Sequence, residues 1–157
     1  SSDLTLLGID ADDHAVAEYS KLTGDNMVFA GTIAEFPLTE YHQYDLILLG
    51  EVLEHIEDPA LIIRQLQEKL LPGQQVLITV PNYISYDSLA AALHSTESVH
   101  PDHHWYFSPY TLSKKLKPEM WDRRLFQFGL YGNKKPNLIQ QAFPAVADCM
   151  IFLVERK

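Results

Sequence analysis

Largely apolar runs alternate with helix-like stretches in the first half of the chain. The runs are continuous rather than alternating with polar residues, which indicates strands covered on both faces, as in a parallel sheet. A helix is predicted after Asp12-Asp13, ending at Gly24-Asp25, and a second one from Pro59 to Leu70, where leucine and isoleucine recur at helical spacing. The four predicted strands are 4–10, 27–30, 44–50 and 75–80.

The rhythm changes after Asn82. Residues 83–118 hold two helical pieces, about 86–94 and 109–116, on either side of a polar, aromatic and histidine-rich loop at 95–108. Ser108 followed by proline is typical of the first residues of a helix, with the serine as its cap. We interpret 83–118 as an insertion into an otherwise regular fold.

Two more strands are predicted near the end of the chain. They cover 124–130 and 149–154 and are joined by a long turn at 131–146 that contains glycine and proline. Such a connection favours an antiparallel pair at the edge of the sheet. Together with the strand and helix alternation before it, this predicts one α/β domain over residues 1–157.

Composition narrows the class of protein. A chain of 157 residues with 46% hydrophobic and 21% charged residues suits one globular domain. Twelve basic against 21 acidic residues leave a net charge of −9, which argues against a broad phosphate-binding face and against a nucleic-acid partner. The single cysteine, Cys149, excludes an internal disulfide and is expected to pack inside its strand. Without a long apolar run or a basic leader, we expect no membrane insertion and a cytoplasmic location.

Several segments together resemble a known family, the class I S-adenosylmethionine-dependent methyltransferases, in particular the small-molecule branch near the ubiquinone-biosynthesis methyltransferases. The resemblance implies a Rossmann-like, mostly parallel sheet with helices on both faces, S-adenosylmethionine as cofactor, and methyl transfer to a small acceptor. It also implies that 83–118 covers the substrate. The segments that carry the resemblance are Gly8-Ile9-Asp10, Tyr44-Asp45-Leu46-Ile47, Glu51 to Pro59 (EVLEHIEDP) and Leu71 to Asn82 (LPGQQVLITVPN).

The resemblance also implies a set of cofactor-binding residues. Asp10, at the end of the first strand, matches the acid that holds both ribose hydroxyls, although it could simply begin a turn. Thr32 and Ile33 match the positions along the adenine edge, where the family often has an acid in place of Thr32. Leu49 and Gly50 match the strand end that runs beside the methionine part, and the glycine permits close approach of the backbone.

One departure from the family concerns the start of the chain. Family members begin with a strand and a glycine-rich loop, Asp/Glu-x-Gly-x-Gly-x-Gly, and this sequence begins where their second strand does. The absent strand is central in the family, between the strands that correspond to 4–10 and 44–50. Three accounts are open: a shortened chain, a strand supplied by a partner chain or second copy, or direct pairing of the two flanking strands.

The histidine-rich loop contains most of the other side chains that could take part in a reaction. His100, His103 and His104 lack the spacing of a regular metal site, so no metal is predicted. The resemblance implies a role in the transfer site: His104 or His103 as general base and Tyr106 as an acceptor contact, which favours O-methylation. Equally, these aromatic residues could only pin the loop onto the sheet.

Two other features leave alternatives open. Glu51 and His55 are spaced one helical turn apart and would share a face, where His55 could either serve the site or take part in capping and packing. A non-catalytic methyltransferase-like binding domain is the main rival function. A dinucleotide reductase is a third hypothesis, because an acid after a strand also holds the ribose of NAD, but the segment EVLEH disfavours it.

Overall fold

A computed structural model of the chain describes residues 7–23, 28–33, 35–132 and 134–157. The predicted strand start at 4–6, Met27 and the predicted helix stop at Gly24-Asp25 lie outside these residues. The strands are β1 (Gly8–Asp10), β2 (Val28–Ala30), β3 (Leu46–Gly50), β4 (Gln75–Pro81), β5 (Trp121–Gly129) and β6 (Cys149–Arg156). The helices are α1 (Asp13–Thr23), α2 (Pro59–Lys69), α3 (Tyr86–Leu93), α4 (Pro109–Lys115) and α5 (Leu138–Ala142), with short 3-10 turns η1 (Leu38–Gln43), η2 (Leu53–His55) and η3 (Pro144–Val146).

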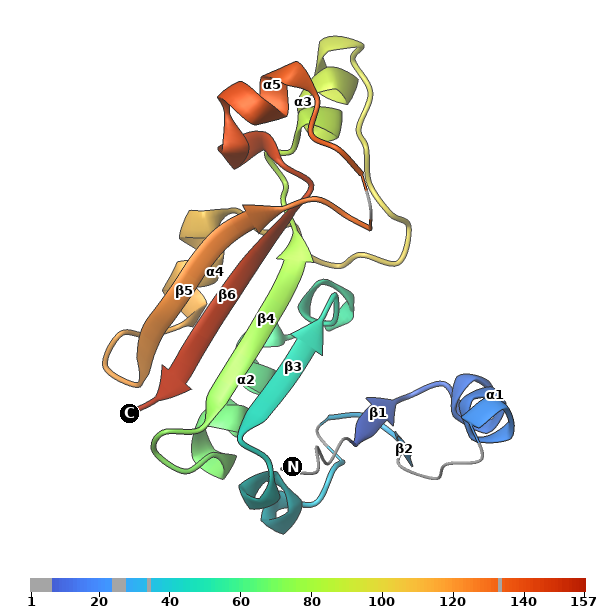
Figure 1. Cartoon of the computed structure of the whole chain (residues 1–157), viewed down its shortest axis with the longest axis vertical. Helices are drawn as coiled ribbons and strands as arrows, with labels where there is room; N and C mark the ends of the chain where they lie inside the picture. The colour runs from blue at the N-terminus through green and yellow to red at the C-terminus, as the bar shows by residue number, and fades with distance from the viewer. Residues whose placement is uncertain (1–6, 24–27, 34, 133) are drawn as a thin grey trace.

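Four strands form one mixed sheet in the order β3-β4-β6-β5 (Figure 1). β3 and β4 are parallel, whereas β6 runs antiparallel to both of its neighbours. The predicted antiparallel pair at the edge of the sheet is therefore confirmed. Its outer strand, β5, begins earlier than predicted, at Trp121, and its register shifts between Arg123 and Leu125.

The first two strands form a separate parallel sheet, β1-β2. Figure 1 shows this pair and α1 set apart from the four-stranded sheet. Among the residues that the structure describes, β1 pairs with β2 and β3 pairs with β4, and β1 and β3 do not pair with each other. Direct pairing of the two flanking strands, one of the three accounts of the missing strand, is thus not what the structure shows.

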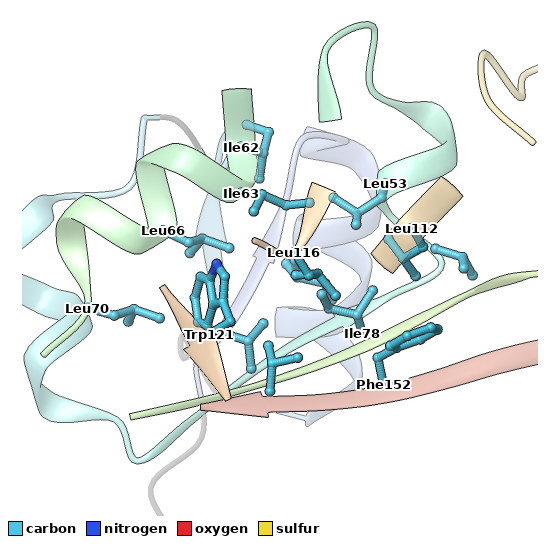
Figure 2. Close-up of a cluster of buried hydrophobic side chains, with 14 of the residues drawn as sticks. Leu53, Ile62, Ile63, Leu66, Leu70, Ile78, Leu112, Leu116, Trp121 and Phe152 are labelled. Atoms are coloured by element: carbon cyan, nitrogen blue, oxygen red, sulfur yellow. The ribbon is translucent and has the colours of Figure 1, made fainter. Parts of the chain in front are cut away.

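One face of the four-stranded sheet holds the hydrophobic core. Val76, Ile78 and Val80 of β4 alternate inward and are at most 1% exposed. Leucines and isoleucines of α2 and Leu112 of α4 cover them, and Trp121 of β5 and Phe152 of β6 belong to the same core (Figure 2). Helices were expected on both faces, but α2 and α4 lie on the same one, behind the sheet in Figure 1.

The opposite face of this sheet is apolar and partly open. Leu48 of β3 is 62% exposed and Leu125 of β5 is 41% exposed, with Leu77 and Leu153 half-buried between them. These residues alternate with the core residues along each strand, as the period of a strand requires. The prediction of strands covered on both faces therefore holds for one face only in the described part of the chain.

Helix starts follow the expected chemistry. Ser108 caps α4 by accepting a hydrogen bond from the backbone N–H of Thr111, and the threonine hydroxyl accepts from the N–H of Ser108, as a reciprocal capping box does. Asp58 caps α2 through the N–H of Leu61, with proline as the first helical residue. These caps fix where both helices begin. Leu112 of α4 is fully buried in the core, so the part of 83–118 that forms α4 belongs to the core.

Truncation of the core beneath α4 should destabilise the whole chain. Leu112 is fully buried, and Leu93, in α3, is 86% exposed. We expect Leu112→Ala to lower the free energy of unfolding by about 2–5 kcal/mol, because a buried cavity replaces the lost side chain. Leu93→Ala is the matched control and should change it by less than about 0.5 kcal/mol. Urea denaturation measures both, and equal effects would contradict the described core.

Candidate functional site

Asp10 lies at the carboxyl end of β1 with an exposed side chain. Its Oδ1 accepts a hydrogen bond of 2.9 Å from the backbone N–H of Asp12, and the Asp12 carboxylate in turn accepts from the N–H of His14 at the start of α1. The carboxylate of Asp10 is thus oriented by the turn that it begins. Asp10 therefore begins a turn, one of the two alternatives, and its exposed carboxylate leaves ribose binding as a prediction.

Thr32 and Ile33 follow β2, and a third residue joins them. The carboxylate of Glu35 accepts hydrogen bonds of 2.8 Å from both the backbone N–H and the hydroxyl of Thr32. These bonds hold the pKa of Glu35 below its ordinary value. The carbonyl of Ile33 accepts a 2.8 Å hydrogen bond from the hydroxyl of Tyr41. The sequence shows a threonine at position 32, where the family often has an acid. It gives no sign that the carboxylate of Glu35 lies beside Thr32.

The end of β3 changes abruptly from buried to open. Leu49 points into the core at 3% exposure, whereas a Cβ added to Gly50 would meet no atom nearer than the Thr79 hydroxyl, 3.9 Å away. Glu51 follows with a φ of 54°, in the left-handed region, where a non-glycine residue is strained. Its backbone N–H donates to the Thr79 carbonyl, and its carboxylate accepts from the hydroxyl of Tyr131. The space above Gly50 and the strained backbone of Glu51 are therefore adjacent at the end of β3.

The histidine-rich loop is tied to the turn η2 by its backbone. The carbonyl of Glu54 accepts from the N–H groups of His104, at 2.8 Å, and Trp105, at 3.2 Å. The Trp105 indole donates to the Glu57 carbonyl at 2.9 Å. Further along, Phe107 is buried and pairs with Asn82 at the end of β4. The loop is therefore held against the carboxyl ends of both β3 and β4.

Some of the aromatic side chains of the loop lie close together and others do not. The ring of His103 lies 4.7 Å from that of His55 and 4.9 Å from that of His100. The ring of Tyr106 lies 6.5 Å from His103 and stacks at a tilt on Tyr83. The side chain of His104 is exposed and has no ring contact among these. Of the three loop residues predicted for the transfer site, His103 and Tyr106 are brought together and His104 stands apart.

His55 and Glu51 do not share a helical face as expected. The residues around them form a single 3-10 turn, Leu53–His55, and Glu51 precedes it in its left-handed conformation. The ring of His55 instead faces the loop, where its Nδ1 lies 3.1 Å from the Asp102 carbonyl. Since a carbonyl only accepts, Nδ1 carries the proton and donates it.

Glu54 is the least expected member of the site. Its side chain is fully buried, and neither carboxylate oxygen has a hydrogen-bond partner among the described residues. Burial, and after it the nearby charge of Glu51, raises the pKa of Glu54 to about 7. The carboxyl of Glu54 and the imidazoles of His55 and His103 each place a potential ligand atom within 4.8 Å of the others. The sequence argument on metals considered the loop histidines alone, because nothing in the spacing shows that residues 54 and 55 lie beside residue 103.

Comparison with known proteins identifies the family. Residues 3–117 match the family model described as a methyltransferase domain, so the chain belongs to this family of S-adenosylmethionine-dependent methyltransferases. The Rossmann-like class and the cofactor expected from the sequence are thereby confirmed at the level of the family. A search of the curated proteins gave no match.

Solved structures agree on the fold. The small RNA methyltransferase HEN1 superposes with a TM-score of 0.69 at 18% identity, over 98% of this chain and 20% of that one. The N-methyltransferase NodS from Bradyrhizobium japonicum, in complex with S-adenosylhomocysteine, gives 0.57 at 17% identity, over 94% of this chain and 64% of NodS. A chain from the complex of the Haloferax volcanii Trm112 activator with its methyltransferase gives 0.66 at 10% identity, over 95% and 70%. At these identities the likeness shows the fold, and the chain spans less than two thirds of HEN1 and of NodS.

The described helices were also compared with the length that a bilayer requires. None of these described helices is both long and apolar enough to cross a membrane.

The buried carboxyl of Glu54 should make folding depend on pH. Its pKa is about 7 in the folded chain and near 4.3 in an unfolded one, so the folded state binds the proton more tightly. The resulting stability is fully present below the unfolded pKa and is lost as pH rises through the folded one. In chelator-treated protein, we expect the urea midpoint of the wild type to fall, relative to that of Glu54→Gln, between about pH 5 and about pH 8.

Glu97→Gln is the control for this experiment, because Glu97 is exposed. Its midpoint should follow that of the wild type at every pH. Parallel curves for the wild type and Glu54→Gln would show that the buried carboxyl does not titrate in this range.

Proposed function

We propose that this chain transfers the methyl group of S-adenosylmethionine to an oxygen of a small-molecule acceptor, as the ubiquinone-biosynthesis branch of the family does. The observation that carries the proposal is the open strand end at Gly50, with the histidine-rich loop fastened beside it. A cofactor that lies along the carboxyl ends of the strands would meet imidazole and phenol groups there. The acidic surface, with a net charge of −9, favours a small acceptor over a nucleic acid.

The residues present fit the cofactor. Asp10 offers an exposed carboxylate to the ribose diol, and Thr32 with Ile33 would border the adenine. Glu35 would supply, from three residues on, the acid that the family often has at position 32. Leu49 and Gly50 would lie beside the methionine part, where the absence of a side chain leaves room. When bound, the cofactor supplies an electrophilic methyl group on a sulfonium.

The loop would align the acceptor and remove its proton. The imidazole of His104 or His103 would take the hydroxyl proton of the acceptor as its oxygen bonded to the methyl carbon and the carbon–sulfur bond broke. Tyr106 would contact the acceptor, and α3 with the loop at 94–106 would cover it. His104 is exposed, so its ring can reach an acceptor without disturbing the core.

A change at Asp10 tests the cofactor site. We expect Asp10→Ala to weaken binding of S-adenosylhomocysteine by about 1–3 kcal/mol, because the ribose hydroxyls lose their acceptor. Isothermal titration of the full chain measures this, and Asp122→Ala, on the edge strand β5, is the control that should leave affinity unchanged. Equal affinity of Asp10→Ala and wild type would remove Asp10 from the site.

A change at His104 tests the chemical step. We expect His104→Ala to lower kcat by about 10²–10⁴-fold with little change in cofactor affinity, because a general base acts only as the acceptor loses its proton. A screen of hydroxylated acceptors, followed by assay of the methyl ether formed, provides the rate. If neither turnover nor affinity changes in His104→Ala and His103→Ala, the loop has only a structural role.

A non-catalytic binding domain is the second candidate, and the open edges of the sheets favour it. One side of β3 pairs with no strand among the described residues. It presents Leu46 and Leu48, at 48% and 62% exposure, next to backbone groups that could accept a strand from a partner chain or a second copy. A cooperatively folded chain that binds no S-adenosylhomocysteine, and whose mass in solution exceeds that of a monomer, would favour this function over methyl transfer.

A further inference from the structure

Tyr131 connects two strand ends that are 80 residues apart in the chain. It lies two residues after β5, and its hydroxyl donates a hydrogen bond to the carboxylate of Glu51, the residue directly after β3. β3 and β5 are the two outer strands of the four-stranded sheet, with β4 and β6 between them. The side chains of Tyr131 and Glu51 therefore meet across the end of the sheet at which Gly50 leaves an open space.

Tyr131 is itself held by a buried carboxylate. Asp148, just before β6, is 9% exposed and accepts a 3.4 Å hydrogen bond from the backbone N–H of Tyr131. The side-chain amide of Gln140 donates to the same carboxylate at 3.0 Å, and the Nζ atom of Lys134 lies 3.6 Å from it. These contacts join the segment after β5 to the start of β6, so the backbone of Tyr131 has a fixed place beside the sheet.

The turn that Tyr131 contacts is strained. Glu51 has a φ of 54°, which costs energy in a residue other than glycine. Its backbone N–H donates to the carbonyl of Thr79 and, at 3.2 Å, to the hydroxyl of Thr79. Among the described residues, the hydroxyl of Tyr131 provides the one hydrogen bond to the Glu51 carboxylate, since Oε2 accepts it and Oε1 is buried without a partner. The side chain of Glu51 is thus held in place from β5.

The phenol of Tyr131 is suited to this contact as a permanent donor. Burial, and after it the hydrogen bond to Glu51, raises the pKa of Tyr131 above its ordinary value. The hydroxyl therefore keeps its proton at neutral pH. A hydrogen bond from a neutral donor to a carboxylate is stronger than one between two neutral groups.

We propose that Tyr131 is a positioning residue of the transfer site, which holds the strained turn after β3 in place through Glu51. This inference rests on the function proposed above, in which the methionine part of the cofactor lies beside Gly50. A strained conformation persists where the surrounding structure over-determines it, and the contact with Tyr131 is part of that surrounding structure. Without the hydroxyl, the turn relaxes and the space beside Gly50 loses its shape. The adenosine part of the cofactor, at Asp10 and Thr32, is unaffected because those residues belong to the other sheet.

The hold on the turn can be measured without any ligand. Hydrogen exchange of the Glu51 amide, which donates to Thr79, is followed by NMR in the full chain and compared with exchange in the middle of β4. We expect Tyr131→Phe, which keeps the ring and removes the hydroxyl, to speed exchange at Glu51 about tenfold relative to β4. Tyr110→Phe is the matched control, because Tyr110 is 67% exposed on α4, and it should leave both rates unchanged.

The consequence for the site is measured with two ligands that differ only in the part expected beside the turn. S-adenosylhomocysteine carries the amino-acid part of the cofactor, whereas 5′-methylthioadenosine has the adenosine and the sulfur without it. By calorimetry, we expect Tyr131→Phe to weaken binding of S-adenosylhomocysteine at least about fivefold and to leave binding of 5′-methylthioadenosine unchanged. A general loss of stability would instead weaken both ligands alike, and Tyr110→Phe should weaken neither.

The proposal is overturned if the Glu51 amide exchanges at the same relative rate in Tyr131→Phe and the wild type. It is also overturned if Tyr131→Phe weakens both ligands by the same factor, or weakens neither. A wild type that binds neither ligand would refute the proposed function, and with it the role in the transfer site. A wild type that binds S-adenosylhomocysteine, with no selective loss in the variant, would refute the role of Tyr131 alone.

Discussion

Strand β4 is hydrogen-bonded on both sides, in parallel to β3 and antiparallel to β6, and this double pairing sets the position of nearly everything else. It aligns Val76 with Val154 and Ile78 with Phe152, so that α2 and α4 can cover one continuous apolar face. Asn82 follows β4 directly and therefore lies at the end of the sheet. The amide of Asn82 donates to the carbonyls of Ala145 and Ala147, which anchors the segment before β6.

The candidate site depends on this arrangement through two strand ends. Asn82 pairs with Phe107, and the Glu54 carbonyl accepts from two loop N–H groups, so the histidine-rich loop is attached at both β4 and η2. His104 is held at Glu54 by its own backbone N–H, and His103 directly precedes it in the chain. Two unfavourable features lie three residues apart in this region: a strained backbone at Glu51, and a buried Glu54 carboxylate with no hydrogen-bond partner in the described part of the chain. Unfavourable local features of this kind persist where the surrounding structure holds them, and they concentrate at functional sites.

Local patterns predicted the elements well because they act over a few residues. The apolar run at 44–50 contains β3, and the run at 75–80 covers all of β4 except its last residue, Pro81. The caps at Asp58 and Ser108 start α2 and α4 where expected. The fold class followed from the alternation of these elements. The placement of α2 and α4 on the same face did not follow, because the apolar stripe of a helix does not say which side of a sheet it covers.

Side-chain convergence lies beyond what the sequence by itself determines. The strands, the helix starts, the cofactor class and the histidine-rich loop could be predicted from the sequence. Each depends on residues that are neighbours in the sequence or on a motif such as EVLEH. Only the tertiary structure decided that Glu54 is buried with no hydrogen-bond partner among the residues described. It also decided that Glu35 accepts a hydrogen bond from Thr32 and that His103 rather than His104 contacts His55. The contact between His55 and His103 spans 48 residues of chain. It is set by the pairing of strands and by backbone hydrogen bonds of the loop, neither of which leaves a periodic signal in the residues that come to lie together.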